Sequence, residues 1–213
     1  MPRTPLALRR SLDAHCAGLS ACRQCPLSPG VQPIVSLARA PRAMLVGQAP
    51  GQTESAGGRP FAGRAGKTLF RWLARAGLDE SSARELLYIA AVTRCYPGPH
   101  RAGRGDRVPS PAERARCSGW LADELRIIRP AVIIPVGRLA VETFLGAVPL
   151  AAVVGQQHEV EHVAGHALVI PLPHPSGASS WIHVAEHRVL LERALELIRK
   201  RVRTLDLPSR SVA

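Results

Sequence analysis

A long glycine-rich connection between an apolar run and an amphipathic segment most constrains how this chain can fold. The apolar run, residues 43–46, predicts a buried strand, and the segment from Leu69 onward has helical spacing. The connection, Gly47–Leu69, holds six glycines and two prolines, with Phe61 as its only aromatic residue. Glycines let backbone N–H groups approach a ligand, and ligands bind at the carboxyl ends of strands in open α/β sheets. We therefore predict that this connection is the active-site loop.

The rest of the 213 residues alternates between apolar runs and amphipathic segments. This alternation predicts a parallel sheet covered by helices on both faces, in a single domain over residues 1–205 with a tail at 206–213. Ser110, followed three residues later by Glu113, predicts a capped helix that begins near Pro111. Strands are predicted at 43–46, 86–92, 131–136 and within 150–173, and helices at 1–20, 67–77, 111–129, 137–145 and 184–202.

The chain is strongly basic, with 28 Lys and Arg against 16 acidic residues and a formal charge of +12. Such an excess favours a polyanionic partner such as DNA or RNA, since cations on the protein neutralise phosphates. The alternative is a basic protein from a GC-rich genome without a role on nucleic acid. No apolar run approaches the ~20 residues of a membrane span, and the N-terminus lacks an apolar signal core. We therefore expect a cytoplasmic protein with reduced thiols and no membrane partner.

Five cysteines in a reducing compartment indicate metal binding or chemistry rather than disulfides. Cys22 and Cys25 form a CxxC pair, and Cys95 and Cys117 are single. Four thiolates from these positions could hold an iron–sulfur cluster or a structural zinc ion, and the lack of a second CxxC pair favours iron–sulfur. The alternative is that some of them are ordinary buried cysteines. We do not expect Cys16 to be a ligand.

Two other motifs are weak evidence for a function, whereas one histidine is a stronger candidate for a site residue. The end of the loop reads GRAGKT, but the first glycine of a P-loop would fall on Phe61, so an NTPase is not indicated. The segment His183–His187 fits the HxxEH pattern of inverted zinc peptidases, although so short a pattern arises easily by chance. His174 follows a strand directly and opens a Pro-Ser-Gly turn. It is therefore a candidate site residue at the same edge of the sheet as the glycine-rich loop.

These features together resemble the uracil-DNA glycosylase superfamily, and above all its iron–sulfur family 4. The loop GQAPGQTESAGGRPFAGRAG is similar to that family's GEAPGxxED…GxPFVGxAG, and YIAAVTRCYP is similar to YITNVVKCRPP. HPSG resembles the family's second motif. The resemblance covers about residues 20–200. It implies a three-layer α/β/α sandwich with a central four-stranded parallel sheet, and a [4Fe-4S] cluster held by Cys22, Cys25, Cys95 and Cys117.

The resemblance also implies a reaction, namely hydrolysis of the N-glycosidic bond of a uracil flipped out of DNA, in base excision repair. Phe61 would stack on the base, and His174 would stabilise the leaving uracil anion. The backbone from Gly47 through Ala49 and Pro50 to Gly51 would contact the base or water. The DNA-binding residues implied are Arg101, Arg104 and Arg107 for phosphates, and Ser176, Gly177 and Trp181 in the minor-groove loop. We expect a nucleoid-associated monomer that acts on single- or double-stranded DNA.

Three positions depart from the family pattern. Gln48 replaces the glutamate of GEAPG, and Ala49 stands where family 1 has its catalytic aspartate. Glu54 is then the nearest carboxylate and our candidate for positioning the water. Ala91 replaces the uracil-reading asparagine, so that Gln48, Thr93 or backbone groups would have to select the base. A wider range of deaminated bases is then an expected set of substrates. The alternative function is a catalytically weak protein of the same fold that binds uracil or abasic sites in DNA.

Overall fold

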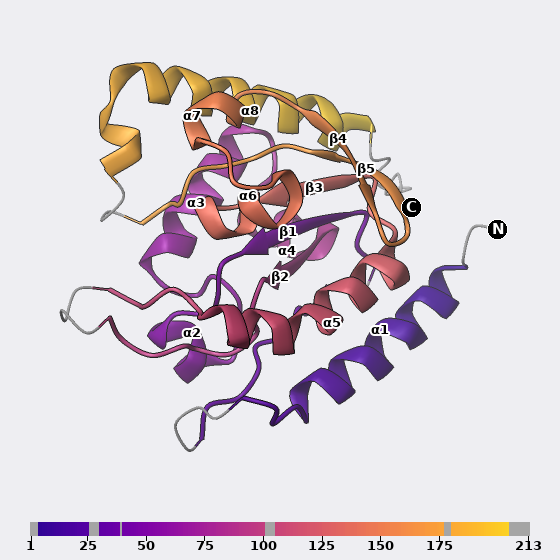
Figure 1. Cartoon of the computed structure of the whole chain (residues 1–213). Coiled ribbons are helices and arrows are strands. Elements are labelled where there is room, and N and C mark those ends of the chain that lie inside the picture. The colour runs from indigo at the N-terminus through magenta and orange to yellow at the C-terminus, as the bar shows by residue number, and fades with distance from the viewer. Residues whose placement is uncertain (1–3, 26–29, 39, 101–104, 177–179, 205–213) are drawn as a thin grey trace.

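A computed structural model of the protein describes residues 4–25, 30–38, 40–100, 105–176 and 180–204. Its centre is a five-stranded sheet in the order β2-β1-β3-β5-β4 (Figure 1). Parallel pairing joins β1 to β2 and to β3, and β3 to β5. The strands are β1 (Ala43–Gly47), β2 (Leu87–Ala91), β3 (Val132–Pro135), β4 (His158–His162) and β5 (Gly165–Val169).

The fold class predicted from the sequence is confirmed, and the structure adds a fifth strand. The four predicted parallel strands are all present, and β4 pairs antiparallel with β5 at the edge of the sheet. The sequence HEVEH of β4 lacks the apolar run of a buried strand, because every second residue of this edge strand is exposed. Its polar composition is the reason that the sequence predicted a turn there.

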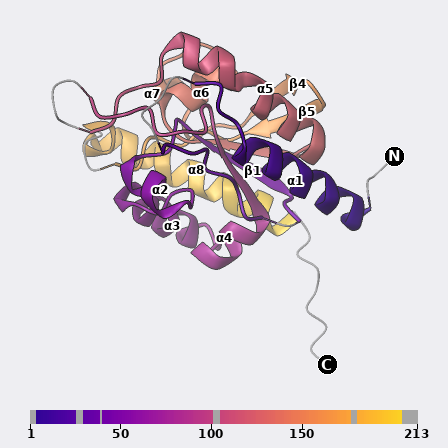
Figure 2. The same cartoon turned by 90° about the horizontal axis from the view of Figure 1, so that it is seen from below.

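Helices cover both faces of the sheet and enclose two separate cores. Alternate residues of β1 point to opposite faces: Leu45 packs with α3, α4 and α8, whereas Met44 and Val46 pack with α1, α5 and α6. Figure 2 shows α3 and α4 on the opposite side of the molecule from α5 and α6. The helices are α1 (Pro5–Ser20), α2 (Gln52–Gly57), α3 (Arg64–Arg75), α4 (Glu80–Leu86), α5 (Pro111–Ile128), α6 (Arg138–Leu145), α7 (Leu150–Val153), η1 (Ser180–His183) and α8 (Ala185–Thr204).

The N-terminal cap of α5 is formed as the sequence predicts. The Glu113 N–H donates to Ser110 Oγ at 3.3 Å, and the Ser110 N–H donates to a Glu113 carboxylate oxygen at 2.7 Å. The short helices α2, α4 and α7 were not predicted, since six, seven and four residues are too few for a periodic apolar pattern. The predicted tail at 206–213 lies outside the described residues. None of the described helices is long and apolar enough to cross a membrane.

The strand order places a ligand crevice at one edge of the sheet. From β1 the chain crosses to β2 on one side, whereas β3 lies on the other side. Open α/β sheets bind ligands outside the carboxyl ends of the strands at such a reversal. The loop after Gly47, the segment after Ala91 and the segment that follows β5 all leave the sheet at this edge.

Candidate functional site

A cavity of about 110 Å³ lies at this carboxyl edge, between the glycine-rich loop and the segment that follows β5. The lining brings together much of the predicted site, although the individual roles stay predictions. The predicted residues that line it are Gly47, Ala49, Pro50, Gly51, Glu54, Phe61, Ala91 and His174.

The ring of Phe61 is held in the cavity by an uncommon backbone conformation. Phe61 has a φ of 51°, in the left-handed region that non-glycine residues seldom adopt. The Arg84 guanidinium anchors this turn, because it donates to the carbonyl oxygens of Pro60 at 2.9 Å and Phe61 at 3.3 Å. A Cβ atom on Gly66 would lie only 1.8 Å from the Phe61 carbonyl oxygen, so glycine is required there. These contacts aim the aromatic face without help from a ligand.

His174 reaches the cavity because its segment extends the sheet by one bridge beyond β5. Val136 and Leu172 form that bridge, two residues before His174. The Ser176 N–H donates to His174 Nδ1 at 3.2 Å, and Ser176 Oγ lies 2.9 Å from the same nitrogen. Since Nδ1 accepts a backbone N–H, the neutral ring carries its proton on Nε2. Gly137, which the sequence did not single out, makes room, because a Cβ atom there would lie 3.1 Å from the ring.

Glu54 lines the cavity, but both of its carboxylate oxygens are already engaged by the backbone. One oxygen accepts the Gly51 N–H at 3.0 Å, and the other accepts the Gly63 N–H at 2.9 Å. The side chain is buried, and it holds the first turn of α2 against the start of α3. These bonds give Glu54 a role in shaping the loop, and they leave fewer lone pairs for a water molecule.

A second carboxylate in the cavity, Asp106, was missed by the sequence analysis. It belongs to the Arg- and Gly-rich segment after β2, which folds back so that Pro99 and Asp106 form a bridge. The Tyr96 hydroxyl donates to this carboxylate, and Asp106 Oδ2 would lie 2.9 Å from a Cβ atom on Gly51. Burial lowers the pKa of His174, and the charge of Asp106 opposes that shift. His174 and Asp106 therefore line the same cavity, close enough for the carboxylate charge to act on the imidazole.

Two predicted substrate-binding side chains do not line this cavity. Thr93 is buried and lies instead in the wall of a second cavity, described below. Gln48 is half-buried, and its backbone carbonyl oxygen accepts the Thr93 N–H at 3.2 Å. The wall beside Ala91 is formed by apolar side chains such as Ile89, so the position of the family asparagine is lined by hydrocarbon.

The predicted DNA-binding residues fall into two groups. Arg101, Arg104 and Gly177 lie outside the described residues. Arg107 is paired through both terminal nitrogens with the Glu113 carboxylate, at 2.7 and 2.6 Å, so its charge is balanced within the chain. The Ser176 hydroxyl is close to His174, and Trp181 stacks on His187 with ring centroids 4.3 Å apart.

A second cavity, of about 210 Å³, brings the four predicted metal ligands together. Cys22 and Cys25 enter it from the end of α1, Cys95 from the segment after β2, and Cys117 from α5. Cys16 is apart from them, with its sulfur 3.8 Å from the Tyr88 hydroxyl oxygen. We refer to this space as the cysteine cavity.

Four thiolates without a bound cation would be energetically unfavourable in the cysteine cavity. Burial raises the pKa of Cys95 to about 12, and the negative charges of Cys117, Cys25 and Cys22 add to the increase. Burial also raises the pKa values of Cys25 and Cys117. The arrangement therefore suits a positively charged group that thiolates would ligate. Among the described residues, no three His, Cys, Asp or Glu side chains are grouped so that they could hold a single metal ion.

Known proteins are similar in sequence to much of this chain. The sequence model of the Uracil DNA glycosylase superfamily matches residues 36–200. A type-4 uracil-DNA glycosylase of Archaeoglobus fulgidus is 34% identical over 174 residues, covering 78% of this chain and 82% of the relative. One from Thermotoga maritima is 34% identical over 135 residues, covering 63% and 65%. A type-5 uracil-DNA glycosylase of Pyrobaculum aerophilum is 29% identical over 170 residues, covering 75% and 70%. The chain thus belongs to the uracil-DNA glycosylase superfamily.

Proposed function

We propose that the protein is a monofunctional DNA glycosylase that hydrolyses the N-glycosidic bond of uracil in DNA. The observation that carries the proposal is that Phe61 and the Nε2–H tautomer of His174 share one cavity of about 110 Å³. A flipped uracil ring would stack on Phe61, and His174 would face its edge. The relatives named as uracil-DNA glycosylases support this reading over that of a catalytically inactive DNA binder.

The proposed reaction proceeds by departure of the base. As the glycosidic bond breaks, its electron pair moves onto uracil, and the His174 Nε2–H donates a hydrogen bond to the resulting anion. Such a preorganised donor in a partly dry cavity stabilises developing charge more strongly than water does. The neutral imidazole suits this role. Burial lowers the pKa of His174 and so favours the neutral ring, whose Nδ1 can accept the Ser176 N–H.

Water then adds to C1′ of the sugar and must lose a proton. We assign this proton to Asp106, whose carboxylate lines the cavity and accepts a hydrogen bond from the Tyr96 hydroxyl. Its negative charge would also stabilise the cationic sugar as the bond breaks. Glu54 is the less suitable base, since two backbone N–H groups already bond to its oxygens.

Selection of the base is proposed to be broader than in relatives that carry the asparagine. Ala91 offers no side-chain hydrogen bond, and the wall beside it is apolar. A site that lacks a paired donor and acceptor discriminates weakly between analogues. Other deaminated bases are therefore candidate substrates besides uracil.

The four cysteines are proposed to hold a [4Fe-4S] cluster. They share one cavity, and the raised pKa values of Cys25, Cys95 and Cys117 favour a group that supplies positive charge. When bound, the cluster would link α1, the segment after β2 and α5. That link would hold in place the segment that carries Asp106.

The proposed partner is uracil-containing DNA, single- or double-stranded, and the proposed form is a cytoplasmic, nucleoid-associated monomer. The formal charge of +12 supports a polyanionic partner. Since Arg107 is paired with Glu113, we propose that Arg101 and Arg104 of the same segment make the phosphate contacts.

The test is release of the base from oligonucleotides by anaerobically purified protein. Single- and double-stranded substrates would carry uracil, hypoxanthine, xanthine or a thymine mismatch. We expect rapid release of uracil and slower release of at least one other deaminated base. Tight binding without any product would overturn the enzyme proposal in favour of the DNA-binding alternative. A His174→Gln variant that binds but releases uracil roughly 100-fold more slowly would support the assigned role.

A further inference from the structure

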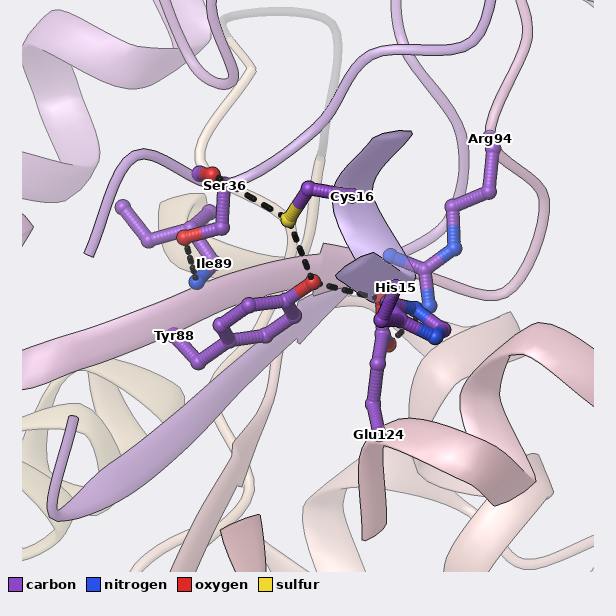
Figure 3. A network of polar contacts seen from close by, with 7 residues as sticks. All are labelled: His15, Cys16, Ser36, Tyr88, Ile89, Arg94 and Glu124. Atoms are coloured by element: carbon purple, nitrogen blue, oxygen red, sulfur yellow. Dashed lines mark hydrogen bonds and ion pairs between the residues drawn. The ribbon is translucent and has the colours of Figure 1, made fainter. Parts of the chain in front are cut away.

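A buried polar network lies beside the cysteine cavity, and the proposed reaction uses none of it. Its centre is Glu124 of α5, a fully buried carboxylate. One oxygen accepts from the Tyr88 hydroxyl at 2.9 Å and lies 3.2 Å from His15 Nε2, and the other pairs with Arg94 (Figure 3). We call these four residues the Glu124 network. It joins α1, β2, the segment after β2 and α5, which are the elements that carry or precede the four clustered cysteines.

Arg94 is only partly satisfied by this network. Its Nη2 donates to Glu124, but its Nε and Nη1 are buried and find no acceptor among the described residues. The side chain is 2% exposed, so water does not compensate for the missing bonds. An unsatisfied buried donor on a charged group costs about 1–3 kcal/mol or more. Such donors usually have a partner in the functional state of a protein.

The cysteine cavity offers that partner. Arg94 forms part of its wall together with all four clustered cysteines. The backbone N–H of Arg94 donates to the sulfur of Cys117, and the guanidinium is close enough to influence that thiol electrostatically. Arg94 also directly precedes Cys95. The residue with the unpaired N–H groups therefore shares one cavity wall with the four sulfur atoms, which become strong acceptors once they are thiolates.

We propose that Arg94 is a positioning residue for the metal centre, in which Nε and Nη1 donate hydrogen bonds to the sulfur ligands while Glu124 fixes the guanidinium. The inference rests on the [4Fe-4S] cluster proposed above. Four thiolates around the cluster carry net negative charge in a buried site, and Arg94 is a buried cation in the cavity wall. Arg23, in the same wall, instead donates to the carbonyl oxygens of Ser20 and Cys22 at 2.9 and 2.7 Å.

This role differs from that of a simple ion pair. An ion pair with Glu124 needs a positive charge but not a planar group, so lysine could replace arginine. A residue that joins Glu124 to sulfur needs several donors in a fixed fork, which lysine lacks. Hydrogen bonds to the sulfurs also stabilise the more negative, reduced cluster and so raise its reduction potential. Cluster retention and potential therefore report on the proposed bonds, whereas folding reports on the ion pair.

The experiment compares Arg94→Lys with Arg126→Lys, an exposed α5 arginine paired with Asp123 at 2.8 Å. Each protein is purified without oxygen, and its iron content, visible absorption and reduction potential are measured. The absorption is then followed in air with a chelator. We expect Arg94→Lys to fold but to lose its absorption roughly 10–100-fold faster, as changes beside metal ligands commonly do. Its potential should also fall, whereas Arg126→Lys should match the original protein.

If Arg94→Lys does not fold, a second variant tests the proposal. Arg94→Met with Glu124→Gln removes both charges of the buried pair, which proteins often tolerate when a single change is not tolerated. It should also lose the cluster faster than the original protein does. If either folded variant retains the original lifetime and potential, the role of Arg94 is overturned. A colourless, iron-free original protein would instead overturn the cluster proposal itself, so the two failures are distinguishable.

Discussion

The ring of Phe61 lies against Gly47, such that a Cβ atom on Gly47 would be 3.0 Å from Phe61 Cζ. Contacts this close force a neighbour to move, and the rigid turn leaves the ring little room. We expect Gly47→Ala to displace the stacking face and to slow uracil release roughly tenfold, since small misplacements in a site are costly. The measurement is single-turnover base release under saturating enzyme.

The matched control for this change is Gly119→Ala on α5, where no atom lies within 4 Å of the added Cβ. That variant should release uracil at the original rate and gain about 0.5–1 kcal/mol of stability, because alanine favours a helix over glycine. If Gly47→Ala is as active as Gly119→Ala, the position of the Phe61 ring is not critical to the reaction.

His174 should titrate below the ordinary range of histidine. Burial lowers its pKa from 6.5, and the Asp106 charge opposes the shift. Removal of that charge should therefore lower the pKa further, since nothing then favours the imidazolium. The ring-proton signals of His174, followed by NMR against pH, check both statements on the original protein and on Asp106→Asn. A His174 pKa at or above 6.5, or an upward shift in the variant, would contradict the proposed geometry.

Features that depend on local sequence were predictable. Ser110 and Glu113 cap α5 because a capping box needs only residues three apart. Cys22 and Cys25 share a cavity with Cys95 and Cys117, since the end of α1, the segment after β2 and α5 converge there. His174 was also predictable, because it directly follows an apolar strand.

Features that depend on the path of a loop were not predictable. Asp106 lines the cavity that contains Phe61 and His174 because its segment folds back onto Pro99. An Arg- and Gly-rich stretch has no apolar periodicity from which this path could be predicted. The pairing of Arg107 with Glu113 has the same origin. Likewise, Thr93 lies in the wall of the cysteine cavity because the chain leaves the regular alternation of β2 after Ala91.

The two carboxylates of the cavity that contains Phe61 and His174 should respond differently to neutralisation. Asp106→Asn should slow uracil release about 100-fold or more and leave DNA binding intact, because it removes the proposed proton acceptor. Glu54→Gln should chiefly destabilise the fold by about 1–3 kcal/mol, since the amide can accept from only one of the two backbone N–H groups. Single-turnover rates and urea unfolding separate the two effects.

The control for Asp106→Asn is Asp123→Asn, the same change at an exposed position of α5. It should leave both the rate and the stability near those of the original protein. The opposite result for Asp106 and Glu54 would support the role predicted from the sequence, in which Glu54 positions the water. If Glu54→Gln is stable but inactive while Asp106→Asn stays active, Glu54 positions the water and Asp106 does not.

The Arg107–Glu113 pair should make stability depend on pH in the acidic range. Hydrogen bonds from Arg107 lower the pKa of Glu113 from 4.5 to about 2. For an acid with a lowered pKa, the contribution to stability is complete above the unfolded value and is lost as the pH falls towards the folded value. Glu113→Gln should therefore be about 1 kcal/mol less stable at pH 7. That difference should narrow from about pH 4.5 downwards, as judged by urea unfolding midpoints. Glu159→Gln, on the exposed side of β4, should show almost no difference at any pH. An undiminished deficit of Glu113→Gln at pH 3 would mean that its carboxylate charge does not stabilise the cap of α5.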